Sequence, residues 1–470
     1  MSGRSKTIAP AIAAGLLALL PAWAAAQMPA HQHPAAPPPA HVHAQTPPAA
    51  NALTLDALEQ MALAHNPTLA QSRADVAAAE GRREQAGLYP NPVVGYEGRE
   101  ISTAPAMNGG EHGVFVQQSI VTAGKLALSR RVFEEERSQA ESVAAAQRDR
   151  VRTAVRVGYY EALGAQQMVD LRRQLAAIAD DAVATTKQLF NVGQADQPDV
   201  LEAEVEAQRA ALAVAAADSD RQRIWLQLAA VVGMPSMPLA PLAGSLDGPL
   251  PDIDRQAALQ KLVQESPEVK AAGQNVERAR LALRRARAQK YPDLSVRGAL
   301  EYNRQGLDVA GLTRSVGWVG MAEVGVALPL FDRNQGNVAT AAAEVTHAER
   351  ELERVKLSLT AAFANPYQTY VLARDAAARY HDHMLPLAEQ AYQLYLQRYR
   401  GMAAAWPQVL IAQRTLFQLR EEYVHTLVDL RRSAADIDGY LLSDGLAAPI
   451  APGEPASVSP GVEVPPPHTP

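Results

Sequence analysis

Apolar and polar residues follow a helical rhythm over a long central part of this chain. Residues 125–190 contain no proline. Within this stretch, apolar positions are spaced alternately by four and three residues, at Leu171, Leu175, Ile178, Ala182, Thr185 and Leu189. This spacing predicts a helix about 100 Å long, at ~1.5 Å per residue, that packs against another helix as a coiled coil.

A second series with the same spacing lies about 210 residues further along the chain. Its members are His381, Leu385, Ala388, Tyr392, Tyr395, Tyr399 and Met402. Pro366 and Pro386 lie in this second long helix and are expected to kink or segment it. Because residues 125–190 have no equivalent prolines, the two halves are not expected to superpose along their full length.

Each half also contains a shorter helix, two segments that alternate in polarity, and a return helix. The first half is predicted to have a helix at 53–88 with Thr54 as its N-cap, strands at 93–101 and 113–121, and a return helix at 198–232. The second half is predicted to have a helix at 257–289, strands at 294–304 and 315–328 joined by a Gly-rich loop at 305–311, a long helix after Asn334, and a return helix at 407–441.

These elements divide the chain into two repeats, at 53–245 and 246–446, joined by a Pro/Gly-rich linker. Segments 27–52, rich in His and Pro, and 447–470, rich in Pro, are expected to be disordered. Residues 1–26 are interpreted as a signal peptide, with positive charge before an apolar run and small residues before Gln27. The alternative, a membrane anchor, is disfavoured because the apolar run is shorter than the ~20 residues of a spanning helix.

Composition narrows the range of functions. The chain has 470 residues, 48% of them hydrophobic but only 5% aromatic, and a formal net charge of -6, which gives no basic surface for nucleic acid. It contains no cysteine, so disulfides, thiolate metal sites, thiol catalysis and an N-terminal lipid anchor are excluded. No phosphate-binding loop, dinucleotide fingerprint, zinc-protease motif or nucleophile elbow is present. We therefore expect no enzymatic activity and no cofactor.

The predicted strands raise a question of closure. Four strands per chain are too few for a barrel, and open sheet edges cannot sit in lipid. Three chains would supply twelve strands, which is within the range of closed outer-membrane barrels. The helices would then continue such a barrel as a tube.

The order and duplication of these elements resemble the TolC-like outer-membrane efflux proteins. The resemblance rests on Tyr89-Pro90-Asn91-Pro92, on Tyr291-Pro292, and on the turn at Phe190-Asn191-Val192-Gly193 with the Asp199-Val200-Leu201-Glu202-Ala203 that follows. The turn Tyr399-Arg400-Gly401-Met402, followed by Val409-Leu410-Ile411-Ala412-Gln413, is most similar to the CzcC-type branch, which serves heavy-metal efflux pumps.

The resemblance implies a mostly α-helical fold with a small β part. It implies a homotrimer with a 12-stranded outer-membrane β-barrel in the outer-membrane lipid, continued by a periplasmic α-helical coiled-coil tunnel. A periplasmic adaptor (membrane fusion protein) would dock at the turns near Gly193 and Gly401. An inner-membrane proton-driven RND-type pump would feed the tube.

The family also implies a gate at these turns, formed by a tyrosine and by aspartates of the return helices. Asp199 matches the aspartate of the first turn and Tyr399 the tyrosine of the second, whereas Gln408 and Ile411 replace the second acidic positions. An acidic constriction would therefore rest on Asp199 and Glu202. The candidate gate and tip residues are Phe190, Gly193, Asp199, Glu202, Tyr399 and Met402.

Two groups of histidines are candidate metal ligands. The pairs His31/His33 and His41/His43 precede the predicted folded part, and imidazole binds Cu(II), Zn(II) and Ni(II). The alternative is a solvated tail with no selected affinity. His381-Asp382-His383-Met384 contains ligand-type residues, but neighbouring helical positions point in different directions, so a helix surface is favoured.

Two further patterns have plain readings. The arginines between residues 278 and 287 are interleaved with Ala and Leu and are interpreted as a solvated helix face. Trp318 and Tyr302 in the second pair of strands fit either an interfacial aromatic girdle or ordinary strand packing.

Three functions remain open from the sequence. The leading hypothesis is a passive exit duct for metal cations such as Cu, Zn, Co, Ni or Cd. The second keeps the duct but assigns it drugs, organic toxicants or a polypeptide exported by type I secretion. The third is a periplasmic coiled-coil scaffold or metal-buffering protein.

Overall fold

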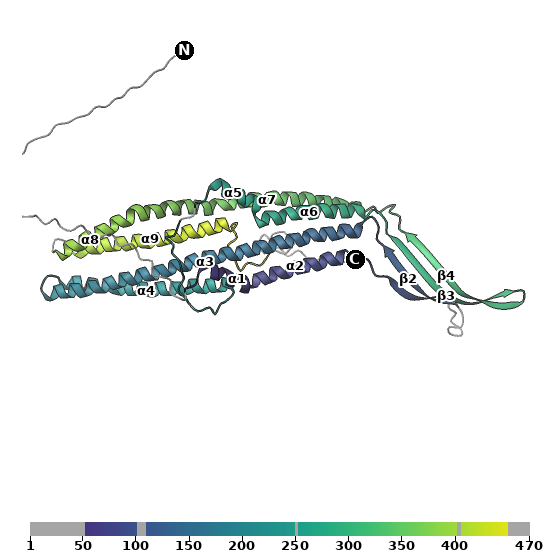
Figure 1. Cartoon of the computed structure of the whole chain (residues 1–470), viewed down its shortest axis with the longest axis horizontal. Coiled ribbons are helices and arrows are strands. Elements are labelled where there is room, and N and C mark those ends of the chain that lie inside the picture. Colours follow the sequence, from purple (N-terminus) through teal and green to yellow (C-terminus); the bar gives the residue numbers. More distant parts are fainter. Residues whose placement is uncertain (1–51, 101–109, 250–251, 402–405, 450–470) are drawn as a thin grey trace, which may run out of the picture. The chain divides into compact units, whose positions relative to one another are not determined.

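The computed structural model describes residues 52–100, 110–249, 252–401 and 406–449. Within them, one order of elements occurs twice: two helices, two strands, then long helices that run out and back (Figure 1). The first set consists of α1 (Leu55–His65), α2 (Pro67–Ala86), β1 (Val93–Arg99), β2 (Glu111–Ile120), α3 (Lys125–Asn191) and α4 (Gln197–Val232). The second set consists of α5 (Arg255–Glu265), α6 (Pro267–Ala288), β3 (Leu294–Val309), β4 (Leu312–Val326), α7 (Gln335–Arg379), η1 (Tyr380–Met384), α8 (Leu385–Arg400) and α9 (Trp406–Asp438).

The prediction of single helices at 53–88 and 257–289 was wrong, because each is divided before a proline. Asn66 and Ser266 are extended, with ψ of 122° and 133°, since the residue before proline disfavours the α conformation. The side chain of each caps the following helix, and Asn66 Oδ1 accepts the Thr68 N–H at 2.9 Å. Thr54 is the N-cap of α1, as predicted.

The four strands form one antiparallel sheet in the order β1-β2-β3-β4. The Gly-rich segment 305–311 is not the loop that was predicted, because β3 and β4 pair as far as Val309 and Leu312. Ala310 and Gly311 both have positive φ, at 54° and 80°. Two such residues make a tight hairpin turn that matches strand twist, so pairing continues almost to the end of the hairpin.

Helix α3 is the centre of the helical part, where it contacts α1, α2, α4, α6 and α9. Its coiled-coil contact with α4 keeps part of the predicted series, since Leu171 is buried and Leu175 packs in the contact. Ala179, Ala207 and Ala210 are buried there, with Leu175 and Val183 beside them, whereas Thr185 is exposed. An α-helix has 3.6 residues per turn, so a strict alternation of four and three drifts around its surface.

Within the described residues, no helix has both the length and the hydropathy that a membrane span requires.

The second coiled coil joins α8 and α9 around Tyr392, Val409 and Leu416. Ala388 and Tyr399 pack against this cluster, as their place in the predicted series suggested. His381 and Tyr395 were predicted in the same series but are exposed. His381 is exposed because it lies in the π-helical turn η1. The wider turn of η1 shifts the residues before α8 to another face of the helix.

Only one of the two prolines divides the second long helix. α7 continues through Pro366, whereas Pro386 lies in the first turn of α8, directly after η1. Proline is tolerated in a first turn because its missing N–H has no partner to lose there. Pro366 therefore does not divide the helix into segments, because α7 is continuous from Gln335 to Arg379.

Candidate functional site

The sheet presents two faces of opposite character. Successive residues of a strand point to opposite faces, and the register aligns the alternate positions of all four strands. One face carries exposed apolar side chains, among them Val94, Tyr96, Val114, Val116, Ile120, Leu300, Tyr302, Trp318, Val324 and Val326. Tyr302 and Trp318 are register partners, and their rings meet edge to face with centroids 5.4 Å apart. Trp318 is 69% exposed, so this ring pair lies on the outside of the sheet.

The other face carries charged groups that pair across strands. Arg297 forms an ion pair with Glu97, and Arg99 lies 3.8 Å from a carboxylate oxygen of Glu301. Glu301 is only 2% exposed. The sheet therefore exposes apolar side chains on one face and carries cross-strand ion pairs on the other, where neighbouring side chains shield Glu301. Lipid against the apolar side and water against the polar side would satisfy both faces.

The second candidate region is the hairpin end between α3 and α4. Gly193 has φ of 75°, and the backbone N–H groups of Gly193 and Gln194 donate to Phe190 O at 3.0 Å and Leu189 O at 2.8 Å. These two bonds form a Schellman motif, which ends the helix and satisfies its last carbonyls. Phe190 remains 45% exposed at this end. The turn thus places an aromatic ring at the end of the hairpin.

Asp199 has a structural as well as a candidate functional role. Its Oδ2 accepts the backbone N–H of Asp196 at 3.2 Å, as part of a capping box at the start of α4. Glu202, one turn further along α4, is exposed. The two carboxylates therefore lie close to each other at the start of the return helix.

The other hairpin end brings an aromatic pair to Asp199. Tyr399, at the end of α8, packs against Trp406 with ring centroids 5.2 Å apart. Burial raises the pKa of the Tyr399 hydroxyl, and the nearby carboxylate of Asp199 raises this pKa further. The structure thus brings together Tyr399 and Asp199, two of the residues chosen from the sequence, from different hairpins. Met402 lies outside the described residues.

Two of the ion pairs that join the hairpins lie at one cavity, and neither had a signal in the sequence. Arg414 of α9 pairs with Glu206 of α4, and Arg172 of α3 pairs with Glu421 of α9 at 2.7 Å. All four side chains line a cavity of about 240 Å³ between the hairpins, with Trp406 at one end. Sequence reasoning missed these residues because each partner lies more than 200 positions away.

The described residues contain no cluster of three or more His, Asp or Glu side chains arranged to hold a metal ion. His381, Asp382, His383 and Met384 are exposed in the π-helical turn η1, where His381 Nδ1 lies 2.9 Å from Asp382 Oδ1. His31, His33, His41 and His43 lie outside the described residues.

Comparison with known proteins identifies the class. The family model described as "Outer membrane efflux protein" matches residues 58–234 and 258–441. Because the two matched segments cover most of the chain, this chain belongs to the outer membrane efflux protein family. The resemblance to TolC-like efflux proteins is thereby confirmed.

Individual relatives agree with this class. The chain is 28% identical over 392 residues to the cobalt-zinc-cadmium resistance protein CzcC of Cupriavidus metallidurans, covering 83% of this chain and 90% of CzcC. It is 29% identical over 433 residues to the protein CyaE of Bordetella pertussis, covering 86% and 87%. The crystal structure of CusC matches with a TM-score of 0.69 at 16% identity, covering 82% of this chain and 91% of that one. At that identity the CusC match shows the fold alone.

Proposed function

We propose that this protein is the outer-membrane exit duct of a tripartite efflux pump, formed by three copies of the chain. The observation that carries the proposal is the contrast between the two faces of the sheet, with apolar side chains exposed on one face and Glu301 shielded on the other. A four-stranded sheet has two open edges, on β1 and β4. Joining three sheets edge to edge gives a closed twelve-stranded barrel that leaves no edge in lipid.

In this proposal the helices form a tunnel that crosses the periplasm below the barrel. The hairpin ends near Gly193 and Gly401 lie at the far end of α3 and α8 from the strands (Figure 1). They would receive a periplasmic adaptor, and an inner-membrane proton-driven pump would supply the cargo. The protein would catalyse no reaction. Residues 1–26 would act as its signal peptide. Each of the two repeats, 53–245 and 246–446, would supply one sixth of the ring that three chains form.

We infer that the cargo is a divalent or monovalent heavy-metal cation. The name of the CzcC relative, a cobalt-zinc-cadmium resistance protein, supports this inference. The charge of the polar sheet face supports it as well, because the carboxylates outnumber the two cations Arg99 and Arg297. These carboxylates belong to Glu97, Glu111, Glu301 and Glu323. A water-filled lumen of negative charge favours cations.

The gate of the proposed duct consists of Asp199 and Glu202 with Tyr399, and Phe190, Gly193 and Met402 shape the tips. The influence of the Asp199 carboxylate on the pKa of Tyr399 supports this assignment, because the two residues belong to different hairpins and lie near their ends. Opening would separate the hairpins as packed units that move between two arrangements. The histidine pairs of the segment 27–52 would add metal capture ahead of the duct.

The first experiment is metal tolerance of the native host after deletion of this coding sequence. Copper, zinc, cobalt, nickel and cadmium are tested beside a drug panel, and intracellular metal is measured. Selective sensitivity with metal accumulation, rescued by the full chain, is the expected result. Drug sensitivity with unchanged metal tolerance would keep the duct and reject its cargo. A rescue by a chain with Leu300→Arg, which places charge at the middle of the proposed lipid face, would contradict the barrel itself.

A further inference from the structure

The end of α6 nearest the sheet carries cations that form no ion pair with a carboxylate of the described residues. We define the basic patch as Arg284, Arg285, Arg287 and Lys290, together with Arg333 just before α7. Arg284, Arg287, Lys290 and Arg333 are exposed. The facing start of α7, residues 335–343, contains no Asp or Glu, so it offers no carboxylate to the arginines of α6.

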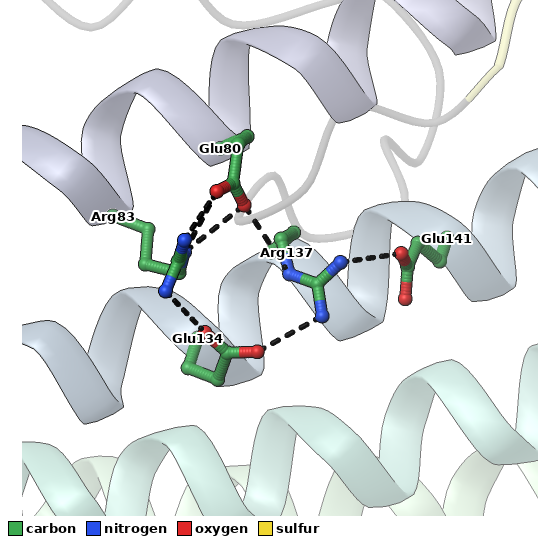
Figure 2. A network of polar contacts seen from close by, with 5 residues as sticks. All are labelled: Glu80, Arg83, Glu134, Arg137 and Glu141. Carbon is green, nitrogen blue, oxygen red and sulfur yellow. Dashed lines mark hydrogen bonds and ion pairs between the residues drawn. The ribbon is translucent and has the colours of Figure 1, made fainter.

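In the first repeat, a network of ion pairs joins α2 to α3 further from the sheet, as Figure 2 shows. There Arg83 of α2 donates to Glu80 at 3.0 Å and lies 3.3 Å from Glu134 of α3. Arg137 pairs with Glu134 at 2.9 Å and with Glu141 at 2.6 Å. The second repeat also joins its two helices through an arginine, because Arg280 of α6 pairs with Glu349 of α7 at 2.8 Å. The cations of the basic patch lie beyond this pair, closer to the sheet.

Apolar side chains that no described residue covers lie beside the basic patch. Tyr291 is 51% exposed, Leu330 65% and Phe331 93%. Lys290 Nζ lies 5.0 Å from the centroid of the Tyr291 ring. Aromatic rings next to Lys and Arg are typical of the boundary between lipid tails and headgroups.

The position of the patch along the chain fits that boundary. Lys290 precedes the first residue of β3 by four positions, and Arg333 follows the last residue of β4 by seven. Arg285 lines an open hollow of about 470 Å³ with Asp332, Asn334 and Asn337, at the N-terminal end of α7. Because the Asp332 carboxylate lines this hollow, the exposed cations Arg284, Arg287 and Lys290 are the groups available to a phosphodiester anion.

The acidic groups nearby do not cancel this charge. Asp293 pairs with Lys125 at 2.8 Å, and Asp332 Oδ1 accepts the backbone N–H of Asn334 at 2.8 Å. Asp332 is thus one carboxylate against the five cations of the basic patch. The patch keeps a net positive charge beside exposed apolar side chains.

We propose that the basic patch binds the headgroups of anionic phospholipid in the leaflet that faces the helices, and so fixes the depth of the sheet in the membrane. The proposal rests on the proposed function, because it requires the sheet to lie in a bilayer. The apolar face of the sheet takes the lipid tails, Tyr291 and Phe331 mark the boundary, and Arg284, Arg287 and Lys290 reach the phosphates.

The test uses the full chain, purified and reconstituted into phosphatidylethanolamine vesicles with or without phosphatidylglycerol. Flotation after a urea wash reports insertion, and native mass spectrometry of the extracted protein reports which lipid stays bound. The variant is R284Q/R287Q/K290Q. The matched control is R82Q/R83Q, which removes two cations of the first repeat that form ion pairs with Glu136 and Glu134. A third variant, R284K/R287K, keeps the charge.

The wild type is expected to retain phosphatidylglycerol over phosphatidylethanolamine, less strongly as salt rises. Each removed cation should lower this preference about fivefold, so the triple variant should lose nearly all of it. The control and the charge-keeping variant should retain it. Insertion of all variants with one unchanged lipid preference would overturn the basic patch and leave the duct intact. Failure of the wild type to insert into any vesicle would instead overturn the proposed function.

Discussion

The ion pair between Arg172 and Glu421 gives the sharpest test of how the hairpins are held together. It joins α3 to α9 at 2.7 Å beside the cavity between the hairpins. The side chains are 30% and 19% exposed, so the pair is neither fully solvated nor fully buried. If the duct opens by separating these helices, the pair stabilises the closed arrangement, and its removal should favour the open one.

The expected size follows from this partial burial. Exposed pairs contribute about 0–1 kcal/mol, whereas breaking a buried pair costs about 3–5 kcal/mol. A value of about 1–2 kcal/mol lies between these limits, and it corresponds to a roughly 5- to 30-fold change in an equilibrium constant. Arg172→Met should therefore raise the ratio of open to closed duct by roughly this factor for each chain.

The assay is single-channel recording in planar bilayers with Arg172→Met, Glu421→Gln and the double variant. The double variant should show less than the sum of the single effects, because both singles remove one interaction. Arg173→Met is the matched control, since Arg173 pairs with Asp218 inside one hairpin at 3.2 Å. Additive effects, or an equal effect of Arg173→Met, would refute the role of the pair. Higher salt should shrink the difference between wild type and Arg172→Met.

The remaining predictions concern stability, insertion and pH. Burial raises the pKa of the Glu421 carboxyl in the folded protein, so the native state binds this proton more tightly than the unfolded chain does. The free energy of unfolding should therefore fall as pH rises through the raised pKa. Glu421→Gln should flatten the dependence of the thermal midpoint on pH in that range. Leu300→Arg, at the middle of the apolar face, should cost about 2–4 kcal/mol of insertion, whereas Val319→Arg at the same level of the polar face should not, as flotation would show. Gly439→Ala should lower the thermal midpoint, because its Cβ would overlap the Thr153 side chain, and Thr153→Gly should restore most of the loss.

The sequence by itself determined the type and order of most elements. The absence of proline between residues 125 and 190 predicted α3 almost to its last residue, because proline removes a backbone donor and is disfavoured in a helix interior. Alternation placed all four strands, although it missed the length of β3 and β4. Local signals were sufficient here because helix termination and strand polarity depend on residues close in the chain.

The candidate site divides in the same way. Phe190, Gly193, Asp199 and Tyr399 were proposed from the sequence through the family resemblance, and their places at or beside the turns followed from local signals. The sequence did not predict that Asp199 and Tyr399 lie near each other across the hairpins. It also did not predict the ion pairs that join α9 to α3 and α4. Such contacts join residues far apart in the chain, so no local pattern records them.

Tertiary structure alone decided which helical positions are buried and what each face of the sheet meets. The coiled-coil contacts moved partly off the predicted series because real helices drift from a strict heptad and because η1 adds part of a turn. The covered Glu301 and the exposed Trp318 follow from the register of four strands drawn from both repeats. Polarity of a residue is a property of the sequence, but the side on which it faces lipid, water or another helix depends on packing between distant segments.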